Sequence, residues 1–332
     1  FTDNLFDGNG RDGFNASVSG AGSAIILRGI GNGTLGGGNS FTNNTRDGFG
    51  VRVSNGGQFT VIDPVAGNNF SLNGNHGFFG SANGPGSLLS IPLGSQATGL
   101  GNTFDNNGTV SLSGSGIQFL ITNGATLLGQ VVNNSASFNT GTGIVYRFVN
   151  TTQGTLNLNR LTATDNGGGG LAILAQNTTF NEILMSQVVA DNNVGGDGIL
   201  YMADNSQVAG RFRVRQSSLI GNGRNGLFLD LNNNSDIDQV FVVDNNVGGN
   251  TIVLGLAFLI DGDTFNTPFS ITNTSGPGFD ITGFNLDIAP ASLLFDTIEP
   301  QGSTPFQPVN QTDVLTGLTT VNGTLITQGT NP

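Results

Sequence analysis

Two aspartates have a spacing that would allow them to act together as a catalytic acid–base pair. Asp165 and Asp191 each precede an asparagine and are separated by about one repeat of the chain. On adjacent turns of a repeating structure their carboxylates would lie about 5 Å apart, the separation that a retaining glycosidase pair uses. The simpler interpretation is that Asp-Asn is favourable turn chemistry, and we favour it.

A second candidate is a site for a hard cation. Side chains with oxygen atoms alternate along one short segment: Asp230, Asn232, Asn234, Asp236 and Asp238. This alternation resembles a calcium loop, although Ser235 stands where such loops carry Gly and Phe241 where a Glu would close them. The segment is a weak candidate for Ca²⁺, with affinity of the weak extracellular class, and Asp261-Gly-Asp263 is a shorter and weaker candidate. With no Cys and one His, zinc and transition-metal sites lack support.

Three arginines and the single histidine complete the set. Arg211, Arg213 and Arg215 alternate and therefore project from one face of a strand. Aligning the repeats on Asn222 and Asn245 sets Arg213 against Asp236, and Arg215 against Asp238. We favour a charge ladder on an outer face over a cationic strip for an acidic glycan. His76 is expected to be a solvated turn residue near Asp47.

Composition excludes several classes of protein. The 332 residues carry 22 acidic and 10 basic side chains, a net charge of −12, which argues against nucleic acid as a partner. All ten basic residues are Arg, and there is no Cys or Trp. The 54 Gly and 43 Asn residues are poor helix formers but favour turns. The longest apolar run, residues 252–260, is too short to span a membrane.

The chain repeats itself at a short and regular period. Gly followed by a large apolar residue recurs at Gly13, Gly48, Gly77, Gly116, Gly143, Gly170, Gly198, Gly226, Gly255 and Gly278. From Gly116 to Gly255 the steps are nearly constant, at 27–29 residues. An Asn recurs shortly before each step, at Asn9, Asn43, Asn73, Asn106, Asn139, Asn166, Asn192, Asn222 and Asn245. Short alternating segments between these landmarks predict strands.

Such a repeat predicts an all-β parallel solenoid, in which each period is one coil and coils stack about 4.8 Å apart. Equivalent positions then form ladders. Apolar residues fill the interior, Asn side chains bond to their copies in neighbouring coils, and Gly lies where φ is positive or coils approach closely. We expect nine to ten coils over residues 1–289.

The motif Asn-x-x-x-Gly-Ile/Leu, best seen at Asn139–Ile144, Asn166–Leu171 and Asn222–Leu227, resembles the repeat of the right-handed parallel β-helices of the pectate-lyase-like superfold. The resemblance implies a right-handed coil. That superfold hosts lyases, hydrolases and surface proteins. The low charge and the absence of Lys are more similar to the non-enzymatic repetitive surface proteins of bacteria. The galacturonase pattern of several Asp, a His and a Lys has no counterpart here.

Composition changes near residue 251, after which seven of the ten Pro residues lie. We expect residues 290–332 to form a C-terminal extension: a cap, a small β-element or a donated strand. The first coil begins at Phe1 without a capping segment, and the run 318–327 is Thr-rich and alternating. These features predict end-to-end self-association through Phe1, Leu318, Val321 and Leu325.

The resulting functional expectation is a non-enzymatic, extracellular structural or adhesive protein of a bacterial surface, built as a stiff rod that polymerises. Two alternatives stay open: a polysaccharide-active enzyme, either a lyase or a glycoside hydrolase, and a calcium-dependent carbohydrate-binding module. Cell-surface glycans are then the expected ligands. Sugar subsites favour Trp or Tyr platforms, and only Tyr146 and Tyr201 are available, which counts against the enzyme.

Overall fold

The structure is a computed structural model that describes residues 2–31, 38–111, 113–250 and 253–254. The chain divides into one unit from Phe1 to Asp261 and a second from Gly262 to Pro332, and all described residues belong to the first. The described residues form strands and turns without any helix, and hence contain no helix that could cross a membrane.

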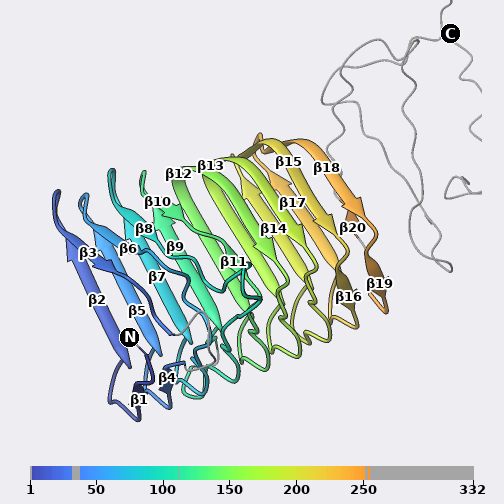
Figure 1. The fold of residues 1–332 in the computed structure, drawn as a ribbon. Coiled ribbons are helices and arrows are strands. Elements are labelled where there is room, and N and C mark those ends of the chain that lie inside the picture. Colours follow the sequence, from blue (N-terminus) through green and yellow to red (C-terminus); the bar gives the residue numbers. More distant parts are fainter. Residues whose placement is uncertain (1, 32–37, 112, 251–252, 255–332) are drawn as a thin grey trace, which may run out of the picture. The chain divides into compact units, whose positions relative to one another are not determined.

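One long row of parallel strands runs through this unit (Figure 1). Its members are β2 (Phe14–Ser19), β5 (Phe49–Ser54), β7 (Phe78–Asn83), β9 (Ile117–Thr122), β12 (Ile144–Asn159), β13 (Leu171–Ser186), β14 (Ile199–Asp204), β17 (Leu227–Asn232) and β20 (Val253–Leu254). The same sheet includes β11 (Val131–Val132), β15 (Gln207–Arg215) and β18 (Asp236–Val243). β11 pairs with the far end of β12, β15 pairs with the far half of β13, and β18 pairs with β15.

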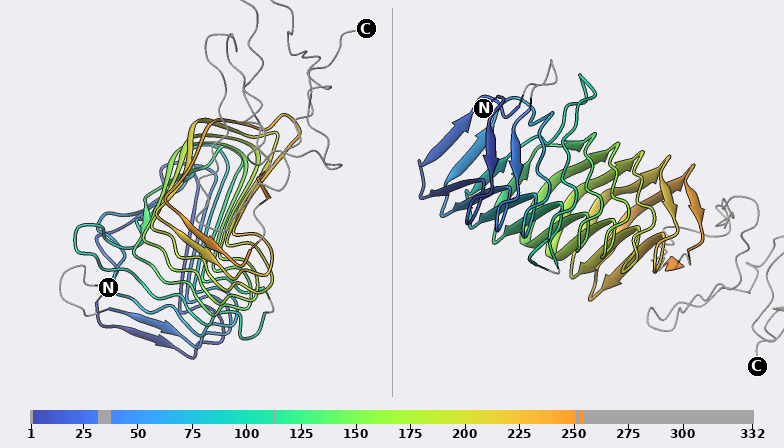
Figure 2. Two further views of the ribbon diagram at one scale, coloured as in Figure 1. Left: turned by 90° about the vertical axis from the view of Figure 1, so that its right-hand side faces the viewer. Right: turned by 90° about the horizontal axis from the view of Figure 1, so that it is seen from below.

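Three smaller sheets form the other sides of the coils. The four-stranded sheet contains β3 (Ala24–Leu27), β6 (Gln58–Val61), β8 (Leu88–Ser90) and β10 (Thr126–Leu128). Two pairs complete the set: β1 (Leu5–Asp7) with β4 (Ser40–Thr42), and β16 (Ser218–Ile220) with β19 (Asn246–Gly248). Viewed along the axis, successive coils lie over one another (Figure 2, left).

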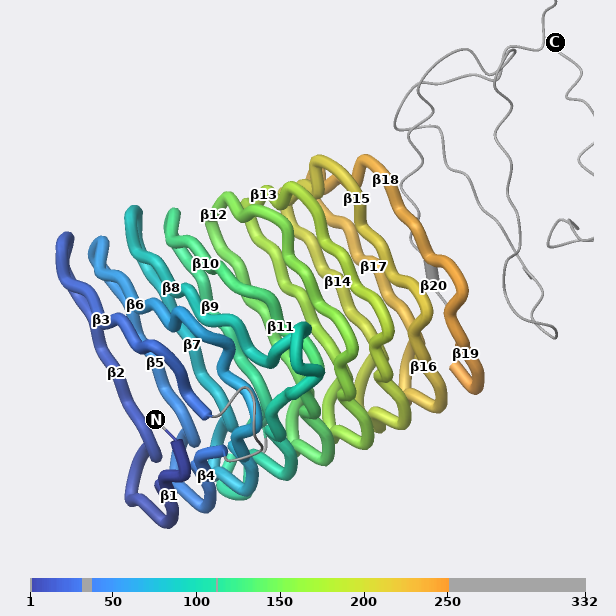
Figure 3. The backbone as a smooth tube through the Cα atoms, viewed as in Figure 1, coloured from blue at the N-terminus to red at the C-terminus, as the bar shows by residue number. Residues whose placement is uncertain are grey.

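The architecture is the predicted parallel β-solenoid. Every residue after a landmark Gly, from Phe14 to Leu227, pairs with its equivalent in the next coil, so the Gly-apolar landmarks mark one register. From β2 to β17 the chain makes about seven turns, slightly fewer than the nine to ten predicted (Figure 3). The landmarks at Gly255 and Gly278 lie outside the described residues.

Stacked aromatic rings fill the interior of the first coils. Phe6, Phe41, Phe70 and Phe104 form one column with centroids 4.6–4.8 Å apart. Beyond Phe104 the same column continues as Ala136. A neighbouring column compensates: Gly80 in β7 is followed in register by Phe119 and then by Tyr146. In the coil of Ala136 the large ring, Tyr146, therefore lies in the second column, as dense packing requires where the first column carries a small side chain.

The coil changes shape between β10 and β12. The four-stranded sheet ends at β10, and β12 replaces two shorter strands by one of 16 residues. The buried Gln153 side chain covers the exposed sheet edge: its Oε1 accepts from the Leu127 N–H (3.1 Å) and its Nε2 donates to the Ala125 carbonyl (2.9 Å). A side-chain amide thus takes the place of the missing strand, which satisfies two buried backbone groups.

The two tyrosines are interior residues. Tyr146 and Tyr201 are fully buried, their hydroxyl groups have no hydrogen-bond partner among the described residues, and burial raises the pKa of both. An unpaired buried hydroxyl is destabilising. We therefore expect Tyr146→Phe to raise the free energy of unfolding by about 1 kcal/mol. Urea denaturation measures the change, and a destabilised variant would contradict it. Neither ring can serve as an exposed sugar platform.

Candidate functional site

A continuous ladder of asparagines joins the coils. From Asn44 to Asn222, each side-chain Oδ1 accepts both the backbone N–H and the Nδ2–H of the Asn one coil earlier, as at Asn107 with Asn73 (3.0 and 3.1 Å). The same backbone bond extends the ladder through Asn9, Asn44, Asn73, Asn107, Asn139, Asn166, Asn193, Asn222 and Asn250. The rungs from Asn44 to Asn222 are buried.

Four of the predicted rungs were wrong. Asn43, Asn106 and Asn192 immediately precede the true rungs and have φ of 53–57°, so they supply the left-handed turn rather than the buried amide. Asn245 belongs to another column, in which its Oδ1 accepts from the Ser217 N–H. Two consecutive asparagines read alike in the sequence, and only the backbone conformation distinguishes the two roles.

The landmark glycines pack against this ladder. A Cβ on Gly143 would lie 2.5 Å from the Ala136 carbonyl oxygen and 2.8 Å from the Asn166 Nδ2. The φ angles of the described landmark glycines are not positive, so close approach of the coils, and not the turn conformation, requires glycine here. The motif Asn-x-x-x-Gly is therefore one structural unit.

A second ladder, buried from Asn39 to Asn134, was missed by the sequence analysis. It contains Asn4, Asn39, Asn68, Asn102 and Asn134, linked by the same Nδ2-to-Oδ1 bonds of 2.9 Å. Each member lies five residues before a rung of the first ladder, from Asn9 to Asn139, and all except Asn102 lie nine residues before a landmark Gly. This constant offset is the sequence signal that could have found the second ladder.

The predicted carboxylate pair lies on adjacent coils but not in one column. The Asp165 N–H donates to the Asp191 carbonyl (3.0 Å), and pairing of Thr162 with Val189 makes Asn192 the equivalent of Asp165. Asp165 is exposed, with φ 56°, at the left-handed turn position. Asp191 accepts from the Ser218 hydroxyl (2.9 Å) and the Ile220 N–H (2.7 Å) of the next coil. The catalytic role of the pair stays a prediction.

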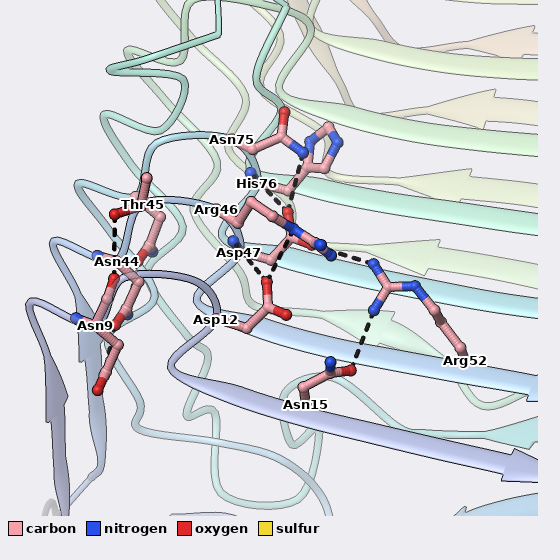
Figure 4. Close-up of polar contacts among 11 residues, drawn as sticks. Asn9, Asp12, Asn15, Asn44, Thr45, Arg46, Asp47, Arg52, Asn75 and His76 are labelled. Atoms are coloured by element: carbon pink, nitrogen blue, oxygen red, sulfur yellow. Dashed lines mark hydrogen bonds and ion pairs between the residues drawn. The ribbon is translucent and has the colours of Figure 1, made fainter.

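Charged side chains gather instead at one corner, which we term the polar corner: Asp12, Arg46, Asp47, Arg52 and His76 (Figure 4). Asp12 and Asp47 occupy equivalent positions before landmark glycines, and each side chain is only 2% exposed. Arg46 lies 3.3 Å from Asp12 and 3.6 Å from Asp47, and Arg52 lies 3.7 Å from Asp47. The two cations offset the two buried negative charges.

His76 continues the column of Asp12 and Asp47 and is buried, contrary to the solvated turn residue predicted from the sequence. Its backbone N–H donates to Asp47 Oδ1 (3.3 Å), and its Nδ1 accepts the Ser115 N–H (3.0 Å). The neutral imidazole therefore carries its proton on Nε2. The ring stacks on Phe79, with centroids 5.8 Å apart. Pairing with Asp47 one coil away was predicted, and the backbone makes that contact.

Burial lowers the pKa of His76 below its ordinary value of 6.5, while the negative charge of Asp47 acts in the opposite direction. The unfolded chain thus binds a proton more readily than the folded one, so stability should fall as pH decreases through 6.5. We expect the melting temperature to drop between pH 7.5 and 5.5, and His76→Asn to reduce that drop. Because His76 is the only histidine, NMR titration of the single imidazole is the direct check; a raised pKa would contradict the prediction.

A shallow groove of about 550 Å³ lies beside this histidine. His76, Ser113, Ser115, Gln118, Thr140 and Thr142 contribute the polar lining, and Val145 and three glycines the rest. Hydroxyl, amide and imidazole groups line it, and none of its described lining residues carries a carboxylate or guanidinium group. The groove can therefore donate and accept hydrogen bonds to a neutral polar ligand.

The predicted calcium segment forms a corner between β17 and β18. Asp230 Oδ1 accepts from Asn232 Nδ2 (2.9 Å), Asn234 has φ 62°, and Asp236, in β18, pairs with Gln207 of β15. Asp238 is exposed in the same strand. In the described part of the chain, no three acidic or histidine side chains are grouped so that they could hold a metal ion. Ca²⁺ binding at this segment stays a prediction, and Asp261-Gly-Asp263 lies outside the described residues.

The predicted arginine ladder has a different register. Arg213 pairs with Phe241, and Arg215 with Val243, instead of with Asp236 and Asp238. The error follows from aligning the coils on Asn222 and Asn245, since the true step runs from Asn222 to Asn250. Arg211 forms the ion pair of this face, with Glu182 of the preceding coil at 2.7 Å.

The remaining predicted residues cannot be placed. Phe1, Leu318, Val321 and Leu325, and the boundary between residues 289 and 290, all lie outside the described residues. No protein-family model, no curated protein and no solved structure matches the chain.

Proposed function

We propose that this chain is a structural rod of an extracellular bacterial surface, with an adhesive role and no catalytic one. The proposal retains the resemblance of its Asn-x-x-x-Gly motif to the repetitive surface proteins among the pectate-lyase-like β-helices. The observation that carries it is the unbroken buried asparagine ladder, which links every pair of successive coils from Asn9 to Asn250. Bonds of this kind in every coil favour stiffness and resistance to proteolysis.

The placement of the carboxylates supports a non-catalytic role. Asp7, Asp105 and Asp191 each accept hydrogen bonds from two groups of the next coil. Asp197 accepts both the backbone and the side-chain N–H groups of Asn225 (3.0 and 2.7 Å). These side chains hold neighbouring coils together. An acid catalyst, in contrast, must be free to reach a ligand.

End-to-end association is compatible with the direction of the ladders. In both buried ladders the donors of one coil face the Oδ1 acceptors of the following coil, as at Asn4 with Asn39 and at Asn9 with Asn44. Any coil with asparagines at these two positions, in the same chain or in another copy, can extend the ladders. This repeated complementarity is the basis on which we propose a filament or surface layer.

Negative-stain electron microscopy of the native protein tests the proposal. We expect filaments or sheets with an axial repeat near one solenoid length, and their loss on deletion of residues 290–332. Isolated short rods at all concentrations would refute polymerisation, and filaments that persist without 290–332 would refute assembly through that segment. Loss of filaments with a chelator would assign a role to the segment Asp230–Asp238.

The groove beside His76 favours a neutral cell-surface glycan as the ligand for the adhesive role, because its lining offers hydroxyl and amide groups without a fixed charge. Gln118→Ala should weaken binding of neutral oligosaccharides in a glycan screen, and Gln216→Ala, at an exposed turn away from the groove, is the control. The polysaccharide-active alternative predicts release of reducing sugar that Asp165→Asn or Asp191→Asn abolishes. Sugar release by the native protein would therefore overturn the non-catalytic proposal.

A further inference from the structure

The outward side chains of the long row of strands form an unusually apolar face. We define the outer face by two columns of side chains that run across β9, β12, β13, β14 and β17. The two columns lie two residues apart along each strand. The first column contains Gln118, Val145, Ala172, Leu200 and Phe228, and the second contains Leu120, Arg147, Leu174, Met202 and Asp230. Strand alternation directs them away from the interior, where Tyr146, Ile173 and Tyr201 lie.

This face differs from an ordinary solvated sheet surface. Seven of its ten side chains are apolar: Met202 is 39% exposed, Ala172 is buried, and the other five are half-buried. Sheets that face water on one side normally carry polar residues there. Apolar residues gathered on one exposed face mark an interaction surface.

Two charged residues stand at the ends of the apolar centre. Arg147 lies between Leu120 and Leu174 in register, and it is exposed. Asp230 lies three coils further along the same column, about 14 Å away at the spacing of a sheet. The two cannot form an ion pair within one chain at that distance, and none of the ion pairs found among the described residues includes Arg147.

We propose that the outer face binds a second copy of this chain in a two-fold, antiparallel lateral dimer. The axis lies parallel to the strands, between Leu174 and Met202. A rotation about it reverses the order of the coils, so that Arg147 of each copy faces Asp230 of the other. Leu174 then faces Met202. Such an isologous contact uses the same patch twice.

The same two-fold rotation also brings the first column of each copy against the first column of the other. Rotation places Val145 against Phe228 and Ala172 against Leu200, so that apolar residues meet apolar residues throughout. The other two-fold arrangement, with its axis along the rod, would place Arg147 against its own copy, and like charges in contact oppose association. The charge pattern therefore selects the antiparallel arrangement.

The area sets the expected strength. The six-residue strands also carry a third outward column, Thr122, Val149, Gln176, Asp204 and Asn232, which forms a mostly polar rim. With this rim, five strands at about 4.8 Å and six residues at about 3.3 Å give a patch of about 24 by 20 Å, and hence roughly 1,000 Å² for two copies. Interfaces of that size are at the low end of specific association. The dimer should consequently be weak, concentration-dependent and sensitive to salt. It is independent of end-to-end assembly, which uses other surfaces, but it buries Val145 at the edge of the groove beside His76, so a glycan in that groove and the dimer compete.

A charge exchange in the full chain tests the arrangement by sedimentation equilibrium. Arg147→Asp should raise the dimer dissociation constant by about tenfold or more, because it creates two carboxylate contacts per dimer. Asp230→Arg should act likewise, and the double variant Arg147→Asp/Asp230→Arg should restore the dissociation constant to within about threefold of the native value. Arg215→Asp makes the same change of charge on β15, outside the outer face, and should have no effect.

Three results would overturn the proposal: a native chain that stays monomeric over the whole concentration range, a dimer that is insensitive to Arg147→Asp, or a double variant no better than either single one. Filaments that none of these variants affects would point to end-to-end contact alone. Thermal melting of each variant verifies that the fold is retained. If the dimer proposal failed, the proposal of a structural rod would still stand, since none of these side chains contributes to the interior ladders.

Discussion

Replacing Gly143 with alanine should destabilise the solenoid by about 3 kcal/mol, the upper range for overpacking a well-packed site. A Cβ at this position would lie 2.5 Å from the Ala136 carbonyl oxygen, 2.8 Å from the Asn166 Nδ2 and 2.9 Å from the Gly170 carbonyl oxygen. Two of these atoms belong to backbone that is hydrogen-bonded between coils, and the third belongs to a buried ladder rung. None can move without separating the coils.

The matched control is Gly154→Ala in the same strand, β12. A Cβ on Gly154 would meet no atom of the described residues within 4 Å, and the φ of Gly154 is not positive. Alanine there should leave stability unchanged or raise it by about 0.5 kcal/mol, since it restricts the unfolded chain. Urea denaturation of both variants gives the comparison. Equal effects of the two substitutions would show that close packing of the coils does not explain the landmark glycines.

Asn107→Leu should also cost about 3 kcal/mol, because leucine leaves a buried donor without its acceptor. Asn107 Oδ1 accepts the backbone N–H of Asn73 at 3.0 Å and its Nδ2–H at 3.1 Å. The Asn107 Nδ2 in turn donates to Asn139 at 3.1 Å. Asn73 keeps other acceptors for its side chain, at Phe41 and Phe70, but its backbone N–H has no second partner among the described residues.

The adjacent residue supplies the control for this ladder. Asn106 is exposed and has φ 57°, a conformation that glycine adopts readily, so Asn106→Gly should change the free energy of unfolding by less than about 0.5 kcal/mol. Amide hydrogen exchange adds a local measurement: Asn107→Leu should accelerate exchange of the Asn73 amide selectively. If Asn106→Gly proved the more damaging of the two, the assignment of ladder and turn roles would be wrong.

The regular repeat was sufficient to predict the solenoid from the sequence. A Gly-apolar pair that recurs at a nearly constant interval indicates coils in which equivalent residues stack, because each coil then places its apolar residue at the same position of the core. The strands after Gly143, Gly170 and Gly198 follow that register without exception. The pairing of Arg213 was mispredicted, since it was measured from an asparagine that belongs to another column.

The candidate site was less predictable because it depends on which side chains meet across coils of unequal length. Asp165 and Asp191 looked equivalent, yet the coil step at this point exceeds their separation by a single position. Such a small offset is enough to move a side chain from a turn to a strand position. The groove beside His76 contains residues from four coils and has no sequence pattern of its own.

By itself the sequence determined the solenoid, its period, the landmark glycines and five of the nine ladder asparagines, because local repetition imposes the same backbone path on every coil. Only the tertiary structure decided which of two adjacent asparagines turns inward, that His76 is buried, and that an apolar outer face surrounds Arg147. The physical reason is that these properties depend on φ at single residues and on register between coils. Neither the φ angle of a single residue nor the register between coils can be derived from composition or from spacing along the chain.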